Sequence, residues 1–357
     1  MSDISTALQQ QVMDALRDGI PLAIAGSGSK SFLGYTRHDM RLNVSEHRGI
    51  VEYDPRELVL TARSGTTLQE IEAALAEANQ MLAFEPPHFG EDATLGGTIA
   101  CGLSGPRRPH IGSARDFVLG CKLLNGCGEI LSFGGQVMKN VAGYDVSRLM
   151  AGAYGTLGIM LEISLKVLPR PAASITVARE CSPAEAIESM SALLGKPLPV
   201  DAICYHGNHC YVRISGSAQA VKEARTKVPG DMLPDAERFW HALREHQLPF
   251  FHHPIHNEQA ALYRIMVKPA TPLLNIEGAW LLDWGGAQRW LYSNEDLASI
   301  RHRVELAGGH VTVFRGGKQS DKLFQPLPES LLTIHRRLKA SFDPENMFNR
   351  GRMYPTL

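Results

Sequence analysis

A loop of small residues follows the first short apolar run of the sequence, Pro21 to Ala25. The loop reads Gly26-Ser-Gly-Ser-Lys-Ser31. It offers consecutive backbone N–H groups, three hydroxyls and one ammonium group, which are the donors that bind a diphosphate. Its spacing matches neither G-x-x-x-x-G-K-[ST] nor G-x-G-x-x-G. These residues alone therefore leave open a phosphate-binding loop and an ordinary flexible turn.

Glycine is concentrated in the middle of the first half of the chain. Nearly half of the 33 glycines lie between Gly90 and Gly158. Glycine destabilises helices and strands, so this density predicts tight turns or a close approach of the backbone to a ligand. One glycine-rich stretch runs from Gly90 to Gly105, and another loop-and-strand segment runs from Val137 to Met160. Three such segments in one domain predict a single extended cofactor.

The pattern of apolar residues predicts the elements that carry these loops. The spacing predicts a helix over Ser5 to Asp18, and a second helix that begins after Thr67, with Glu70 placed for a capping box. Composition changes at Pro169-Arg-Pro171, which we interpret as a domain boundary. Beyond it, two similar alternations of strand, hairpin and helix are expected over 174–228 and 263–314, followed by a last helix over Leu331 to Ser341.

Charge and composition exclude several classes of protein. The 36 Lys and Arg residues balance the 37 Asp and Glu residues, so the chain lacks the basic field that nucleic-acid binding needs. The N-terminal residues are acidic and amide-rich, and no stretch of about 18 apolar residues follows. The six cysteines contain no C-x-x-C pair. We expect a cytoplasmic protein without a transmembrane segment, held on a membrane only through partners.

Several motifs of the chain resemble one flavoprotein family. IAGSGSKS, EDATLGGTIACGLSGPRR with GSARDFVLG, and GTLGIMLEISLKVLP are similar to the FAD-binding segments of the p-cresol methylhydroxylase and vanillyl alcohol oxidase family. KNVAGYDVSRLMAGAYGTLGI and FDPENMFNRGRM resemble the FAD-binding E subunits of glycolate oxidase, also called glycolate dehydrogenase. The similarity extends over nearly the whole chain.

The resemblance implies an α+β fold with three parts. These are a two-subdomain FAD-binding domain over 1–171, an α+β cap domain with an antiparallel sheet over 172–320, and a C-terminal return segment over 321–357. Relatives with covalent FAD carry a histidine where this loop has Ser29 and Lys30, so we expect noncovalent FAD. The implied cofactor-binding residues are Gly26, Ser27, Gly28, Ser29, Ser31, Thr94, Gly96, Gly97, Gly102, Asp116, Gly155, Gly158 and Ile159.

The resemblance also implies a reaction, the oxidation of glycolate to glyoxylate in a complex. A larger flavin-binding D subunit and an iron–sulfur F subunit would be the partners, and the F subunit would accept the electrons. The histidine-rich motif of catalytic relatives is missing here, so the catalytic residues stay unknown. His252, His253 and Arg315 are weak candidates, and no metal site is expected. The alternatives are a stand-alone D-2-hydroxyacid dehydrogenase, acting on glycolate or D-lactate, and a non-catalytic flavin-binding assembly subunit.

Overall fold

The computed structural model describes residues 2–35, 38–135, 145–252, 260–317 and 323–357. The chain divides into two compact units. Unit 1 comprises Met1–Ser104, Gly112–Arg170 and Pro326–Leu357, and unit 2 comprises Gly105–Ile111 and Pro171–Gln325. A short piece of the glycine-rich region therefore packs with unit 2, and the C-terminal segment packs with unit 1.

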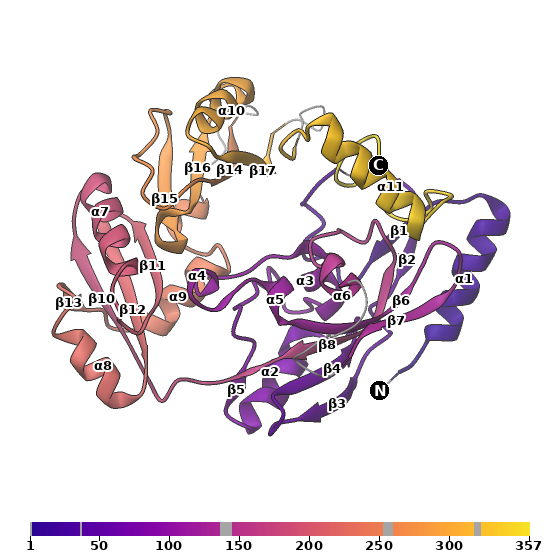
Figure 1. Ribbon diagram of the computed structural model, residues 1–357, viewed down its shortest axis with the longest axis horizontal. Coiled ribbons are helices and arrows are strands. Elements are labelled where there is room, and N and C mark those ends of the chain that lie inside the picture. Colours follow the sequence, from indigo (N-terminus) through magenta and orange to yellow (C-terminus); the bar gives the residue numbers. More distant parts are fainter. Residues whose placement is uncertain (1, 36–37, 136–144, 253–259, 318–322) are drawn as a thin grey trace. The chain divides into compact units, whose positions relative to one another are not determined.

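Unit 1 is built on a five-stranded antiparallel sheet with the strand order β3-β4-β8-β6-β7. Residues on its central strand β8 are mostly buried, and its aliphatic side chains fill the interior. Three short helices, α3, α5 and α6, lie over one face of the sheet (Figure 1). The bounds are β3 (Ile50–Asp54), β4 (Val59–Arg63), β6 (Val118–Leu124), β7 (Ile130–Gly134), β8 (Ile159–Lys166), α3 (Leu95–Cys101), α5 (Ala114–Phe117) and α6 (Val146–Leu149).

Unit 1 also contains a separate two-stranded parallel sheet, and the first glycine loop follows one of its strands. β1 (Leu22–Ala25) pairs with β2 (Met40–Asn43), and the loop begins where β1 ends. The helix α1 (Ser5–Asp18) has the predicted bounds and buries Leu8, Val12 and Ala15 in a core shared with β1 and the C-terminal residue Phe348. The loop is therefore anchored to a packed hydrophobic core on its N-terminal side.

Local capping signals placed the helix α2 (Leu68–Glu77) correctly. The side chain of Thr67 accepts a hydrogen bond from the N–H of Glu70, and the Glu70 carboxylate accepts one from the N–H of Thr67. This reciprocal pairing satisfies two otherwise unpaired donors and confirms the predicted capping box. The short strands β5 (Gln80–Met81) and β9 (Leu168–Pro169) form a separate pair next to it.

Unit 2 is an eight-stranded antiparallel sheet in the order β13-β10-β12-β11-β15-β16-β14-β17. The helices α7 and α8 pack on β10, β11 and β12 around Ile187, Met190 and Ile214 (Figure 1). The two expected alternations are present, but they share this one sheet. The bounds are β10 (Ala173–Glu180), β11 (Val200–His206), β12 (His209–Gly216), β13 (Asp231–Met232), β14 (Ala261–Met266), β15 (Ala279–Asp283), β16 (Gln288–Ser293), β17 (His310–Gly316), α7 (Pro183–Leu194), α8 (Ala218–Arg225), α9 (Ala236–Arg244) and α10 (Leu297–Leu306).

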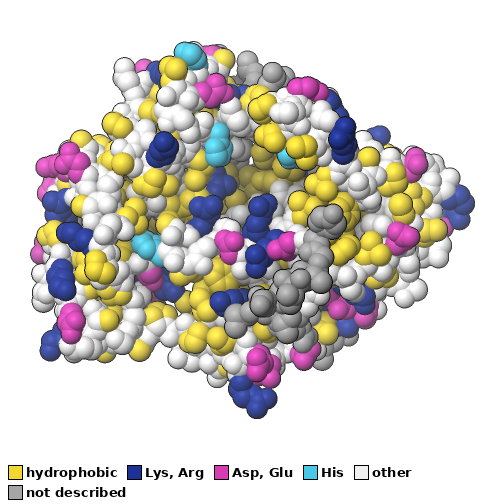
Figure 2. All heavy atoms as spheres, viewed as in Figure 1, with side chains coloured by type: hydrophobic (Ala, Val, Ile, Leu, Met, Phe, Trp, Pro, Cys, Tyr) yellow, Lys and Arg dark blue, Asp and Glu magenta, His cyan; other side chains and the backbone are white. Residues whose placement is uncertain are grey.

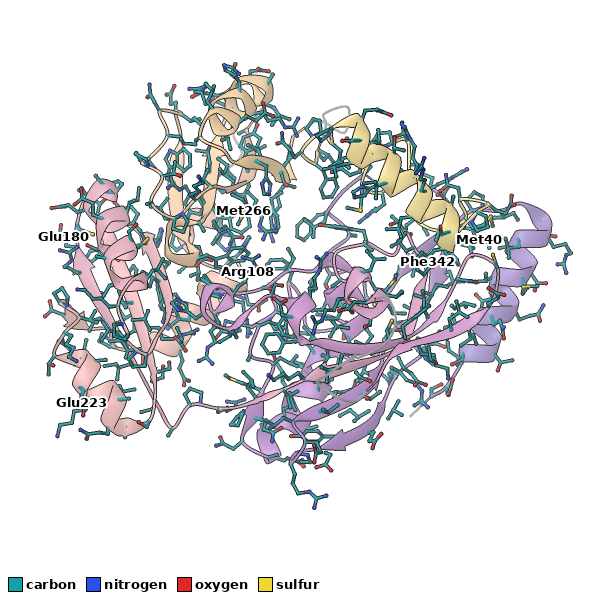
Figure 3. All side chains as sticks on the ribbon, viewed as in Figure 1. Met40, Arg108, Glu180, Glu223, Met266 and Phe342 are labelled. Atoms are coloured by element: carbon teal, nitrogen blue, oxygen red, sulfur yellow. The ribbon has the colours of Figure 1, made fainter. Side chains whose placement is uncertain are left out.

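The piece Gly105–Ile111 is held in unit 2 by a buried ion cluster. Arg107, which precedes the short helix α4 (Arg108–Ile111), lies 2.6 Å from Oδ2 of Asp201, and Arg213 donates to Oδ1 of the same carboxylate at 2.7 Å. Arg108, labelled in Figure 3, stacks on the ring of Trp284, whose indole N–H donates to the carbonyl of Gly105. One carboxylate therefore holds two arginines from distant parts of the sequence.

Both signs of charge are interspersed around the periphery of the face shown in Figure 2. Among the described residues, no helix is both long and apolar enough to span a membrane.

Removing the shared carboxylate should destabilise unit 2. We predict that Asp201→Ala lowers the free energy of unfolding by about 3–5 kcal/mol, because two buried guanidinium groups lose their counter-ion. All four tryptophans lie in unit 2, so tryptophan fluorescence during urea unfolding reports on this unit. The control is Glu223→Gln on α8 of the same unit, an exposed carboxylate that accepts a hydrogen bond from the Gln219 side chain and whose loss should change stability by less than about 0.5 kcal/mol. Equal effects of the two substitutions would show that the Asp201 carboxylate does not stabilise unit 2 through its arginines.

Candidate functional site

A cavity of about 720 Å³ lies within unit 1. Its size is in the range of sites that enclose a cofactor or drug-sized molecule. The first glycine loop, the N-terminal half of α3, the turn before β8 and the C-terminal segment all contribute to its wall. The lining residues include Ile24, Gly26, Ser27, Gly28, Ser29, Lys30, Ser31, Asp39, Arg41, Ser64, Thr94, Gly96, Gly97, Cys101, Tyr154, Gly155, Gly158, Ile159, Asn349 and Arg352.

The loop after β1 exposes backbone donors to this cavity. Gly28 has a φ of +86°, a conformation that favours glycine, and a Cβ there would meet no atom within 4 Å. The N–H of Ser31 donates to the carbonyl of Gly28 and closes the turn. The N–H groups of Ser27, Gly28 and Ser29 have no acceptor among the residues that the structure describes. Three neighbouring unpaired donors on such a turn can bind an anion.

Two glycines are required because the loops approach each other closely. A Cβ on Gly26 would lie 2.4 Å from Oγ1 of Thr94, and a Cβ on Gly96 would lie 2.7 Å from Cβ of Ser64. Thr94 is the N-cap of α3, and its hydroxyl accepts a hydrogen bond from the N–H of Gly97. The first loop and the second glycine-rich stretch therefore meet at Thr94, on the wall of the cavity.

Ser64 contributes an unsatisfied polar atom to the wall. The residue is 1% exposed, and its hydroxyl has no hydrogen-bond partner among the described residues. Its backbone is fixed, because its N–H donates to the carbonyl of Leu161 and its carbonyl accepts from Gly96. A buried hydroxyl without a partner costs free energy, so its position at the cavity is consistent with a polar ligand group that completes it.

The charge of the lining is positive. Lys30, Arg41 and Arg352 line the cavity, and Asp39 is the one acidic residue in its described lining. Asp39 is already paired with Arg350 at 2.9 Å. The cavity therefore carries unpaired backbone donors and excess positive charge, which fit the two phosphates of a dinucleotide.

The thiol of Cys101 also lines this cavity. Burial raises the pKa of Cys101 to about 11, although Lys30 and Arg352 act in the opposite direction. The side chain is therefore a neutral thiol at pH 7, which is a poor nucleophile.

The structure brings together all but two of the predicted cofactor-binding residues. The exceptions are Gly102 and Asp116, which are not in the wall of this cavity. Gly102 is the C-cap of α3 with a φ of +62°, and a Cβ there would lie 3.0 Å from the backbone of Gly152. The Asp116 carboxylate accepts hydrogen bonds from the N–H and the hydroxyl of Ser113, so it caps α5. Local structure therefore accounts for the glycine at position 102 and for the aspartate at position 116.

Sequence reasoning missed several residues of the wall. Ser64 and Arg41 lie in strands or turns without a glycine-rich signal, and Asn349 and Arg352 lie more than 300 residues after the first loop. The ending FDPENMFNRGRM was the available signal, since a turn-rich polar segment after the last helix needs a partner for its polar groups.

The weak catalytic candidates all belong to the region of unit 2. His252 is exposed at the end of the helix η1 (Pro249–His252), and His253 lies outside the described residues. Arg315 lies on β17, and its Nη1 is 3.2 Å from Nδ1 of His246. His246 is 7% exposed and stacks on Phe251 with ring centroids 3.8 Å apart. The histidine beside Arg315 is therefore His246, which differs from the two candidates named from the sequence.

Burial and two arginines lower the pKa of His246. Desolvation is the main cause, and Arg315 and Arg264 add to it. Arg264 on β14 is oriented by Gln288, whose side-chain oxygen accepts from its Nε at 2.7 Å, and it lies over the ring of Trp284. The face of unit 2 that holds β14 and β17 therefore presents two arginines next to a neutral imidazole.

Comparisons with known proteins identify an FAD binding domain and a family of relatives. A family model described as an FAD binding domain matches residues 5–134. Glycolate oxidase subunit GlcE of Escherichia coli (strain K12) is 50% identical over 355 residues, which cover 99% of both chains. Glycolate oxidase subunit GlcD of Bacillus subtilis (strain 168) is 34% identical over 155 residues, 43% of this chain and 33% of that protein. D-lactate dehydrogenase of Anaerostipes hadrus is 36% identical over 137 residues, 38% of this chain and 28% of that protein.

The fold is shared with a solved structure of alkyldihydroxyacetonephosphate synthase. It superposes with a TM-score of 0.64 at 16% sequence identity, over 95% of this chain and 74% of that one. The predicted fold, a p-cresol methylhydroxylase-type FAD-binding domain with an α+β antiparallel cap, is thereby confirmed. Because half of its residues are identical over nearly the full length of both chains, this chain belongs to the glycolate oxidase subunit GlcE family and carries an FAD binding domain.

Proposed function

We propose that this chain is the FAD-binding subunit of a dehydrogenase complex that oxidises glycolate to glyoxylate. The single observation that carries the proposal is the cavity of unit 1, where unpaired N–H groups, close glycine contacts and three cationic side chains meet. These features fit a dinucleotide with a diphosphate. The identity to the Escherichia coli subunit supports glycolate as the substrate of the complex.

The residues of the cavity have distinct roles in this proposal. The N–H groups of Ser27, Gly28 and Ser29 would bind the diphosphate, and Thr94, Gly96 and Gly97 would let the backbone of α3 lie against it. Gly155, Gly158 and Ile159 form a further part of the wall, before and at the start of β8. When bound, FAD supplies the acceptor for the two electrons that leave the alcohol carbon.

We further propose that FAD binds without a covalent bond. The first loop has Ser29 and Lys30 where covalent relatives carry a histidine, and neither side chain is a suitable nucleophile there. The Nζ of Lys30 donates to the carbonyl of His88 at 3.0 Å, and Cys101 is a neutral thiol. Denaturation should therefore release intact FAD from the chain.

The glycine of the first loop provides a direct test. We predict that Gly28→Val weakens FAD binding by about tenfold or more, because the side chain would occupy space beside the unpaired N–H groups and strain the turn. The measurement is the ratio of flavin to protein after denaturation. Gly19→Val is the matched control, since Gly19 also has a positive φ of +66° and open space around its Cβ, but caps α1 outside the cavity. Equal flavin content in the two variants would refute the assignment.

The complex would contain two further subunits. We propose a larger flavin-binding D subunit and an iron–sulfur F subunit as partners, with the F subunit accepting the electrons. The similarity of 155 residues, 43% of this chain, to GlcD of Bacillus subtilis supports the idea that both flavin subunits share this domain. We place the assembly in the cytoplasm, with any membrane attachment made through partners.

Activity measurements separate this proposal from its alternatives. We predict that the purified chain is yellow, that anaerobic glycolate leaves its flavin bands unchanged, and that dye reduction appears only after the partner subunits are added. Gly28→Val should abolish the activity of the reconstituted complex.

Two results would favour the other functions. Bleaching of the isolated chain by glycolate or D-lactate would indicate a stand-alone 2-hydroxyacid dehydrogenase. In that case Arg315, which is paired with His246, is the group to test as the carboxylate anchor, by Arg315→Met. Full complex activity with the Gly28→Val chain would indicate an assembly subunit whose FAD takes no part in the reaction.

A further inference from the structure

The C-terminal segment Asp343–Arg352 forms part of the wall of the cavity. It follows α11 (Glu329–Phe342), whose last residue, Phe342, is labelled in Figure 3. Asn349 and Arg352 both line the cavity, although they come more than 300 residues after the first loop. Both side chains form hydrogen bonds with backbone atoms of the cavity wall. The partners lie in β1, at the end of the first loop and in the chain that follows it, and in the turn before β8.

Asn349 joins two walls of the cavity. Its side-chain oxygen accepts from the N–H of Ile24 in β1 at 2.8 Å, and its amide nitrogen donates to the carbonyl of Tyr154 at 2.6 Å. Its own N–H donates to the carbonyl of Leu22, and the N–H of Leu22 donates to the carbonyl of Met347. The segment therefore runs beside β1 like a short additional strand, and one amide side chain fixes the distance from β1 to the turn before β8.

Arg352 holds the far end of the first loop. Its guanidinium donates to the carbonyls of Ser31 and Tyr35 at 2.9 and 3.1 Å. The carbonyl of Arg352 in turn accepts from the N–H of Tyr35. Asn349 and Arg352 thus contact the chain on either side of the N–H groups of Ser27 to Ser29, at Ile24 before them and at Ser31 after them.

A buried ion pair fixes the segment itself. Lys339 on α11 is 7% exposed, and its Nζ donates to the carbonyl of Thr156, the Asp343 carboxylate and the carbonyl of Phe348, at 2.6, 2.6 and 2.8 Å. The Asp343 carboxylate accepts from the N–H groups of Met347 and Phe348. Every donor of the ammonium group is used, so the turn that presents Asn349 has one well-defined geometry.

We propose that Asn349 and Arg352 are positioning residues of the cofactor site, and that the C-terminal segment sets the geometry of the first loop for dinucleotide binding. This inference rests on the proposed FAD-binding function and extends it to residues at the opposite end of the chain. In this proposal the segment holds the backbone on both sides of the loop by hydrogen bonds, and the N–H groups of the loop itself bind the diphosphate.

The test is FAD affinity measured separately from the stability of the FAD-free chain. We predict that Asn349→Ala and Arg352→Ala each raise the Kd for FAD by about tenfold, since each loses two hydrogen bonds to the walls of the cavity. Arg352→Lys should restore little of the affinity, because a lysine keeps the charge but lacks the forked donors that reach two carbonyls. The control is Glu345→Gln, an exposed position in the same segment.

Titration of FAD into the full-length FAD-free chain, followed by quenching of flavin fluorescence, gives the Kd. The melting temperature of each FAD-free variant is measured alongside, and each variant is expected to be as fully folded at the titration temperature as Glu345→Gln. Affinities within twofold of wild type, full rescue by Arg352→Lys, or a loss of affinity that only follows a lowered melting temperature would each overturn the inference and leave the proposed function intact. A wild-type chain that binds no FAD would overturn both.

Discussion

The first loop leaves the N–H groups of Ser27, Gly28 and Ser29 without an acceptor among the described residues, and much of unit 1 is arranged around this constraint. Backbone donors normally find partners within a fold, so leaving three of them available requires neighbouring elements to define the loop from outside. β1, which pairs with β2, holds the chain where the loop begins, and Arg352 donates to the carbonyl of Ser31 near its end. Thr94 lies against Gly26 on one side of the loop. The loop is therefore specified by its surroundings more than by its own contacts.

The same constraint explains why the wall of the cavity is assembled from distant parts of the chain. The second glycine-rich stretch contributes the start of α3, where Gly96 lies directly against Ser64. The buried pair of Lys339 and Asp343 connects α11 to Thr156 and thereby to the turn before β8. In unit 2, Asp201 has a comparable structural role, since it holds the short piece Gly105–Ile111 that directly follows the glycine-rich stretch.

Local signals in the sequence are sufficient for elements with strong capping or periodicity. The bounds of α1 and the capping box at Thr67 are predictable because they depend only on residues a few positions apart. The glycine-rich loops are predictable as sites of close backbone approach, because Gly26 and Gly96 lie too near Thr94 and Ser64 to carry a side chain. Asp116 caps α5 through Ser113 and is not in the wall of the cavity, so its cofactor-binding role stays a prediction.

The parts that sequence reasoning missed depend on long-range contacts. Ser64 is distinguished only by a hydroxyl that lacks a hydrogen-bond partner among the described residues, which no sequence pattern reveals. Asn349 is one of two asparagines in the polar tail, and its importance follows from the positions of Ile24 and Tyr154. His246 is one of several histidines in the sequence, and only the fold places it beside Arg315. Contacts across hundreds of residues are set by packing, so only the folded structure reveals them.

Hydrogen–deuterium exchange of the full-length chain with and without FAD tests the central claim most directly, because it reports where the cofactor binds. We predict slower exchange on FAD addition in the first loop, the start of α3, the turn before β8 and the segment that contains Asn349 and Arg352. The strands of unit 2 should exchange at unchanged rates. Protection confined to unit 2, or no protection in the first loop at saturating FAD, would contradict the assignment of the cavity in unit 1 as the cofactor site.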